Sequence, residues 1–153
     1  MEEKKLLKDL LSDNPELRQT ATHALWNLWL GQAGEKAEFR IRKGTKKMDI
    51  GQHELAQKEF ESLVVDYPKF AEAHNKLATV LYLQRKYNES IKECEITLKM
   101  NPNHFGAWNG LGLCHYQLAN YAMAIEGFKT ALAIQPFADF NKVYIARCRG
   151  QLN

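Results

Sequence analysis

Apolar side chains recur along this chain at intervals of three and four residues, the spacing that places them on one face of an α-helix. Residues 2–11 carry pairs of leucines four residues apart, which predicts a short, highly charged helix. Asn14 can cap a following helix, and Pro15 suits its first turn. A second helix is therefore predicted from about Pro15 to Leu30, where a glycine follows.

From Ala37 onward the pattern repeats with a period of 34 residues. Pro68, Pro102 and Pro136 are spaced by 34, and the residues between them keep the same register. A fixed period of this length is typical of a stacked repeat, in which each unit buries its apolar face against its neighbours. We call residues 34 apart a column, and the clearest columns are Leu77, Leu111 and Ile145; Ala56, Ser90 and Ala124; Phe60, Cys94 and Phe128; and Gly44, Ala78, Gly112 and Ala146.

Each unit contains two helical stretches separated by a short polar turn, the first at residues 51–52. Each unit closes on its proline, which cannot continue a helix. The small side chains of the column that begins at Gly44 should let the two helices of a pair approach closely. Phe60 and Phe128 should then fill the gap between successive pairs.

The end of the chain keeps the repeat register for half a unit. The segment from Asp139 to about Gln151 is apolar on one side and turns polar near its end, as a terminal capping helix does. The sequence thus predicts an all-α solenoid. Its predicted parts are an N-terminal helical extension over residues 1–36, three helix pairs over residues 37–70, 71–104 and 105–138, and a C-terminal capping helix over residues 139–153.

The repeating residues resemble the tetratricopeptide repeat (TPR), whose signature is Trp-x-x-Leu-Gly-x-x-Tyr in the first helix, Ala, Phe and Ala in the second, and a closing Pro. In the third unit His115 replaces the usual Tyr, and in the second unit His74 replaces the usual Trp. The first unit has Arg40, Lys43 and Lys47 where the family buries apolar residues, so its first helix should pack loosely or in a different register. The matching residues of the third unit are Trp108, Leu111, Gly112, Ala124, Phe128, Ala131 and Pro136.

The resemblance extends over residues 37–151, about three quarters of the chain. Residues 70–82 and 104–116 are also similar to small proteins of this repeat class from bacteria and plants. The resemblance implies a right-handed α-solenoid in which the first helix of each pair lines a concave groove that usually holds a peptide. Carried over column by column, it implies that the groove is lined by Arg42, Thr45, Asn75, Lys76, Thr79, Tyr82, Asn109, Leu113, Tyr116, Phe140, Tyr144 and Arg147.

Two columns of this implied groove bear on recognition. Asn75 and Asn109 share one column, and an Asn amide can both donate to and accept from a peptide backbone. Tyr82 and Tyr116 share another and offer apolar area with a polar tip, although they would equally serve to pack adjacent helices. Such a lining suits an extended or short helical segment of a partner protein.

One specificity within the family can be compared directly. Members that bind the acidic C-terminal tails of major heat-shock chaperones hold two carboxylates with Lys, Asn, Asn, Lys and Arg. The matching positions here are Ile41, Thr45, Asn75, Gly106 and Gly110, so every positive charge is missing and a chaperone tail is not the expected partner. The two glycines either let a ligand or a neighbouring helix approach the backbone, or stand where no side chain was needed.

Positive charge is concentrated in one place, although the net charge of the chain is only +3. This stretch is a candidate contact for RNA phosphates or an acidic surface. It has no interleaved aromatic residues for base stacking, and a solvated face of the first repeat helix is the simpler interpretation, so nucleic acid is not the favoured partner. The five cations are Arg40, Arg42, Lys43, Lys46 and Lys47.

No set of residues indicates catalysis or metal binding. Cys94, Cys114 and Cys148 are odd in number and widely spaced, which favours buried core thiols and a reducing compartment over a disulfide scaffold or a zinc site. His53 begins a His-Glu pair, but the second His of a zinc-protease motif is missing because position 57 is Gln. We therefore predict no enzymatic activity, no cofactor and no metal.

These considerations predict an adaptor, scaffold or assembly factor that holds a segment of another protein. Salt-sensitive binding of RNA or an acidic surface is the main alternative. A third is a self-associating structural protein, a homodimer in which Trp26 and Trp29 form an exposed aromatic pair. The simpler interpretation of these two tryptophans is that they bury against the first repeat pair.

The expected location is intracellular and cytoplasmic. No apolar run reaches the roughly 18 residues of a membrane span, and the first residues lack the sustained apolar stretch of a secretory signal. A plastid or mitochondrion is the alternative if a transit peptide is absent from this chain. The sequence leaves open the identity of the partner, the oligomeric state and whether the chain is a fragment of a longer protein.

Overall fold

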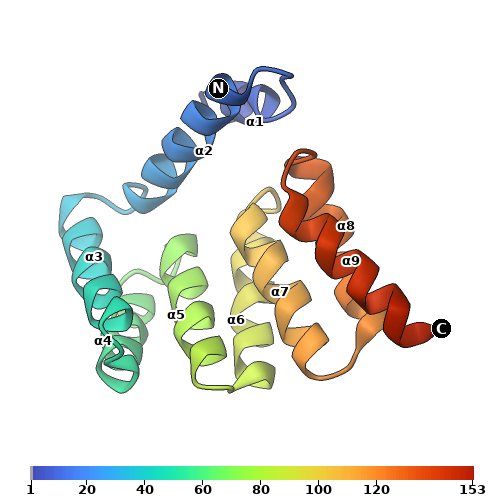
Figure 1. Cartoon of the computed structure of the whole chain (residues 1–153). Helices are drawn as coiled ribbons and strands as arrows, with labels where there is room; N and C mark the ends of the chain where they lie inside the picture. The colour runs from blue at the N-terminus through green and yellow to red at the C-terminus, as the bar shows by residue number, and fades with distance from the viewer. Residues whose placement is uncertain (1) are drawn as a thin grey trace.

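The computed structural model describes residues 2–153, and these form helices without any strand (Figure 1). The predicted second helix agrees with the structure at both ends, and Asn14 caps it as expected, because its Oδ1 accepts hydrogen bonds from the backbone N–H groups of Glu16 (2.9 Å) and Leu17 (3.4 Å). The helices are α1 (Glu2–Asp9), α2 (Pro15–Leu30), α3 (Glu35–Asp49), α4 (His53–Asp66), α5 (Ala71–Leu83), α6 (Tyr87–Met100), α7 (Phe105–Gln117), α8 (Tyr121–Ile134) and α9 (Asp139–Leu152).

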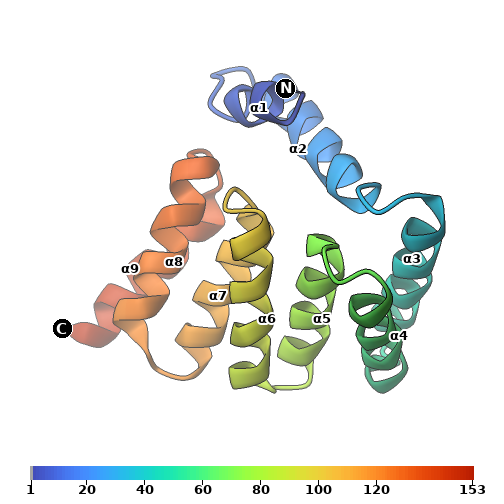
Figure 2. The same ribbon diagram turned by 180° about the vertical axis from the view of Figure 1, so that it is seen from behind.

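Helices α3 to α9 stack in chain order into a right-handed solenoid, each antiparallel to the next. The inner layer consists of α3, α5, α7 and α9, the first helix of each unit and the capping helix (Figure 1). The outer layer consists of α4, α6 and α8, which face the viewer in Figure 2. Inner helices also contact one another directly, α3 with α5 and α5 with α7, so the inner layer is a continuous wall.

The turn within each helix pair requires a left-handed backbone at one fixed column. Gly51 has φ 85°, Arg85 has φ 62° and Ala119 has φ 60°. Glycine adopts this conformation freely, whereas an L-residue pays about 1–2 kcal/mol for it. The same turn recurs at all three positions, so the stacking of the pairs imposes it even where the residue does not favour it.

Glycines inside the pairs make room for phenylalanine rings. A Cβ atom on Gly44 would lie 2.6 Å from Cε1 of Phe60, and a Cβ on Gly112 would lie 2.8 Å from Cε1 of Phe128. Both rings are fully buried. They therefore occupy the space within their own pair, and not only the gap between successive pairs as the sequence predicts.

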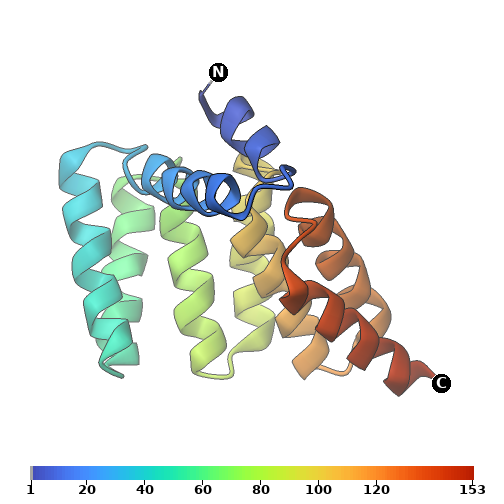
Figure 3. The ribbon, with the colours of Figure 1, turned by 45° about the horizontal axis from the view of Figure 1, so that its top comes forward.

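Helices α1 and α2 form a hairpin that does not continue the stack. From its junction with α3, α2 crosses the inner layer and leads back to α1, on the side of the molecule where α8 and α9 are joined (Figures 1 and 3). In the part of the chain that the structure describes, no helix has both the length and the apolar character needed to span a membrane.

Candidate partner-binding surface

The inner layer is the candidate binding surface, but α2 covers the part of it where α5 and α7 begin (Figure 3). Gly106, in the first turn of α7, lies directly under this helix. A Cβ atom on Gly106 would be only 2.6 Å from Cη2 of Trp26. Of the two interpretations of this glycine, the structure thus supports close approach of a neighbouring helix.

The two tryptophans of α2 pack against the start of α7. The ring of Trp29 stacks on His104 with a centroid distance of 4.5 Å, and its Nε1–H donates to Glu3 at 3.2 Å. Trp26 meets Phe105 edge-on at 5.3 Å. Trp29 is only 4% exposed. The expectation that both bury against the first repeat pair is therefore wrong about their contact, and their burial removes the basis for self-association through an exposed pair.

A fully buried carboxylate, that of Glu72, lies beside the tryptophans. Its Oε2 is 2.7 Å from His104 Nε2, and its Oε1 accepts a hydrogen bond from Asn75 Nδ2 at 3.0 Å. His104 Nδ1 accepts the Ala107 backbone N–H at 3.0 Å, so the imidazole carries its proton on Nε2 and donates it to Glu72. Asn75 is 7% exposed and its amide is bound internally, which differs from the expectation that it faces a peptide.

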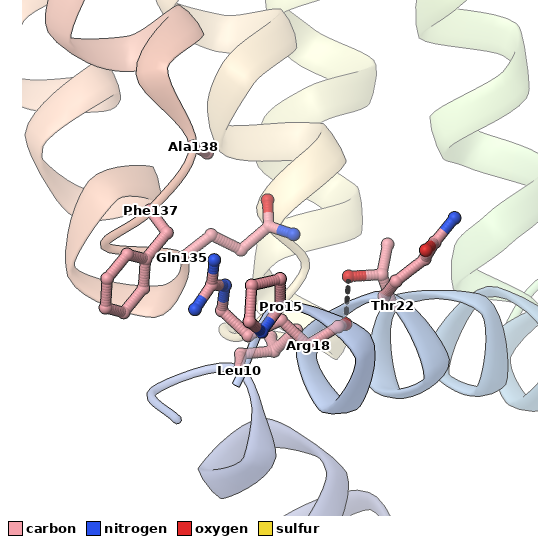
Figure 4. A pocket seen from close by; sticks show the side chains of 8 residues that line it. Leu10, Pro15, Arg18, Thr22, Gln135, Phe137 and Ala138 are labelled. Carbon is pink, nitrogen blue, oxygen red and sulfur yellow. Dashed lines mark hydrogen bonds between the residues drawn. The ribbon is translucent and has the colours of Figure 1, made fainter. Parts of the chain in front are cut away.

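The opposite end of α2 is anchored as well. The guanidinium of Arg18 lies 3.9 Å from the ring centroid of Phe137, in the turn between α8 and α9, and also donates to the Ser12 carbonyl at 2.8 Å. Figure 4 shows this contact at a cavity of about 230 Å³, which Thr22 and Gln135 also line.

The apolar residues of the hairpin and α7 form one buried cluster. Burial of a large apolar side chain contributes about 1.5–3 kcal/mol, so detaching α2 would cost several times that amount. We conclude that α2 is a fixed part of the inner wall and not a removable plug. The cluster consists of Leu10, Ala21, Leu25, Trp29 and Phe105.

The rest of the inner layer is open and carries a row of half-exposed aromatic side chains, here called the aromatic row: Tyr82, Tyr116, Tyr144 and Phe140. Tyr116 and Tyr144 meet edge-on at 5.1 Å, and Phe140 lies 4.8 Å from Tyr144. Gln117 Nε2 donates to the Tyr82 hydroxyl at 3.3 Å, which links α7 to α5. Burial raises the pKa of Tyr82 while the Gln117 hydrogen bond opposes the rise. The phenol therefore keeps its proton and can donate it to a ligand.

Other predicted groove residues differ in their accessibility. Thr79 is exposed on α5, with its hydroxyl donating to the Asn75 carbonyl at 3.0 Å. Arg147 is exposed, and its guanidinium lies 5.0 Å from the Tyr144 ring centroid. Leu113 packs into the cluster around Phe128. Asn109 is partly buried, and its Oδ1 accepts no hydrogen bond from residues 2–153.

A cavity of about 340 Å³ opens at the end of the wall where α2, α3 and α5 meet. It brings together Arg42 and Thr45, which were predicted for the groove, with Lys46, which was assigned only to the basic stretch. Lys76 of α5 completes its polar lining, and Leu30 of α2 is the apolar member. The cavity thus joins residues from three helices that sequence spacing alone does not bring together.

The basic stretch is largely neutralised within the protein. Arg40 pairs with Asp66 at 2.7 Å, and Lys47 pairs with Glu59 at 3.3 Å, so both cations bind acids of α4. Arg42 pairs at 2.9 Å with the glutamate four residues earlier on its own helix. These pairs explain how α3 packs on α4 in the regular register although apolar residues are missing, and they weaken the case for RNA binding.

The cysteines are buried core thiols, as the sequence predicts. Burial raises the pKa of Cys94, Cys114 and Cys148, which keeps them protonated and poorly nucleophilic. Burial also lowers the pKa of His115. Across residues 2–153, no three His, Cys, Asp or Glu side chains come together as a metal site would require.

Sequence reasoning missed Glu72, His104 and Gln117. Glu72 and Gly106 share a column whose residues face the concave side, and a charged residue beside a bare glycine in that column is a signal that another element covers it. Nothing in the local sequence shows that this element is α2. Gln117 lies next to Tyr116 at the end of α7, and its role depends on the neighbouring helix α5.

Comparison with known proteins identifies the family. A family model described as "Tetratricopeptide repeat" matches residues 41–96 and 84–139. The chain is 27% identical over 81 residues to tetratricopeptide repeat-containing protein trd-1 of Caenorhabditis elegans, covering 52% of this chain and 10% of the relative. It is 25% identical over 100 residues to small glutamine-rich tetratricopeptide repeat-containing protein 2 of Saccharomyces cerevisiae, covering 65% of this chain and 29% of the relative.

The chain therefore spans only a minor part of the curated relatives it matches, between 10% and 34% of their length. Among solved structures, the first TPR of Spaghetti (RPAP3) bound to the HSP90 peptide SRMEEVD superposes with a TM-score of 0.73 at 15% identity, covering 74% of this chain and 90% of that chain. At this identity the superposition shows the fold alone. The protein is a member of the tetratricopeptide repeat family.

Proposed function

We propose that this protein is a non-catalytic interaction module, an adaptor or scaffold, that binds an extended segment of another protein along the open part of its inner layer. The aromatic row is the observation that supports this proposal. Its half-exposed rings continue from α5 across α7 to α9. Aromatic side chains provide a large contact area with few torsions to immobilise, which makes them frequent centres of binding energy.

The width of the open wall favours an extended segment over a helix. Helices α5 and α7 have 13 residues each, which is about 20 Å of length. Because α2 covers the beginning of these helices, about half of that length, roughly 10 Å, stays open. A helix with its side chains is about 10–12 Å wide, whereas a single extended strand is narrower and fits beside α2.

The structural relatives agree with peptide binding without defining the partner. The RPAP3 structure contains an HSP90 peptide, and the TPR2B domain of yeast Sti1 is in complex with an Hsp70 peptide. The expectation that a chaperone tail is not the partner of this chain remains a prediction. Two positions of the chaperone-binding pattern are inaccessible here, since Ile41 is buried and Gly106 lies under Trp26.

The test is a blocking substitution that leaves the core intact. Thr79→Arg places a long side chain on the exposed inner face of α5. Thr130→Arg is the matched control on α8 of the outer layer, because both threonines donate to the carbonyl four residues earlier, at 3.0 and 2.9 Å. Peptides selected from a random phage library on the wild-type protein provide the ligand.

We expect T79R to weaken binding of the selected peptides at least about tenfold in isothermal titration calorimetry, because tenfold corresponds to the loss of only about 1.4 kcal/mol. T130R should bind as the wild type does. Equal affinity of T79R and the wild type, or failure to select any peptide over an uncoated surface, would contradict the proposal.

A further inference from the structure

The cavity between α2, α3 and α5 has a lining that selects for one kind of ligand group. Arg42, Lys46 and Lys76 all border it, together with the hydroxyl of Thr45. Its volume of about 340 Å³ is about ten times the 30 Å³ that one water molecule occupies in the liquid. The cavity can therefore hold a carboxylate-bearing side chain and some of its hydration.

The positive charge at this cavity is only partly compensated. Glu38 pairs with Arg42 at 2.9 Å, and both oxygens of Glu72, one turn before Lys76, are taken up by other side chains. The C-terminal end of α2 adds about half a negative charge. Against these stand three cations, and neither Lys46 nor Lys76 has a carboxylate partner within the described range 2–153.

The cavity is continuous with the aromatic row. Lys76, Thr79 and Tyr82 follow one another at three-residue intervals on α5, so they lie on one side of that helix. A segment that crosses the open wall from the cavity to the contact between Tyr116 and Tyr144 passes over two helix spacings. With about 8–10 Å per spacing this is about 16–20 Å, or five to six residues of extended chain.

We propose that the partner segment is acidic at one end and apolar at the other, with an Asp or Glu side chain bound by Lys46 and Lys76. An aromatic or aliphatic side chain five or six residues away then packs on the aromatic row. This inference rests on the proposed function and adds the chemistry of the partner to it. The acid site differs from the five positions of the chaperone-tail pattern, since none of its cations stands at one of those positions.

The experiment is selection of a random dodecapeptide phage library on the full chain, in parallel with two variants. Lys46→Gln with Lys76→Gln removes the unpaired cations of the cavity. Lys43→Gln with Lys92→Gln is the control of equal charge, because both of these lysines are exposed and line none of the cavities described above. Unchanged urea midpoints for the four substitutions would confirm that folding is preserved.

We expect peptides selected on the wild type and on the control to carry Asp or Glu at five or six residues from an aromatic or aliphatic residue. Peptides selected on the double variant at the cavity should keep the apolar residue without enrichment of acids. Replacing the acid of the best synthetic peptide by its amide should weaken binding to the wild type about fivefold, or about 1 kcal/mol, and leave binding to the cavity variant unchanged.

The outcomes separate this inference from the proposed function. Peptides without acids that lose affinity for T79R would overturn the acid site and leave the groove in place. An acid preference that persists in the cavity variant would overturn the assignment to Lys46 and Lys76. Failure to enrich any peptide would overturn both proposals.

Discussion

The buried carboxylate of Glu72 holds two donors, His104 Nε2–H and Asn75 Nδ2–H, at the place where α2 meets the inner wall. Glu72→Ala would leave both donors unpaired in a site without exposed surface. Hydrogen bonds to a charged group contribute about 1.5–3 kcal/mol each. Relief of the buried charge offsets part of this loss, and breaking a buried pair from one side typically costs about 3–5 kcal/mol. We expect a loss in that range.

The assay is equilibrium urea unfolding followed by circular dichroism and by tryptophan fluorescence, because Trp29 stacks on His104. The matched control is Glu93→Ala. Glu93 also pairs with a histidine, His74, at 2.6 Å, but the pair is partly exposed. Removing it should cost only about 1 kcal/mol.

If E72A does not fold, Glu72→Gln provides the measurement, since its carbonyl can still accept the His104 proton and its loss should be intermediate. Equal effects of E72A and E93A, or a loss below about 1 kcal/mol for E72A, would refute the reasoning that the buried carboxylate organises this junction.

Three further substitutions test other parts of the structure. Asn141 is fully buried, and no partner among the described residues binds its amide; Asn141→Ala, the residue that Ala107 presents in the same column, should raise the free energy of unfolding by about 1 kcal/mol, and a lower urea midpoint would contradict this. Because burial lowers the pKa of His115 from 6.5, the unfolded state takes up this proton more readily; the stability contribution is complete above pH 6.5 and is lost as pH falls through the folded-state pKa. His115→Phe should flatten that decline in urea titrations across pH, and an unchanged slope would show that other groups cause it. Ala119→Gly should relieve the left-handed backbone at φ 60° and raise stability by about 0.5–1 kcal/mol, whereas Gly51→Ala, with no atom near the added Cβ, should lower it by a similar amount in the same assay.

The period of 34 residues determined most of the fold. Apolar spacing within each unit specifies helices, and the columns of Gly44 and Phe60 specify which faces meet, because these are contacts between neighbours along the chain. The end of α2 and the start of α9 follow equally from local signals, the glycine after Leu30 and the proline at position 136. The aromatic row was predicted for the same reason, since Tyr82 and Tyr116 repeat one column.

Only the tertiary structure decided where α2 lies and therefore how much of the groove is open. An apolar stripe with Trp26 and Trp29 shows that a face is buried, but not against which surface, and its partners at the start of α7 are more than 70 residues away in sequence. Asn75 was predicted to be free because its column faces inward, yet α2 and Glu72 enclose it. The basic stretch likewise appeared unpaired until packing brought Asp66 to Arg40. Local spacing determines the direction of a side chain, whereas its partner depends on long-range packing that no periodicity encodes.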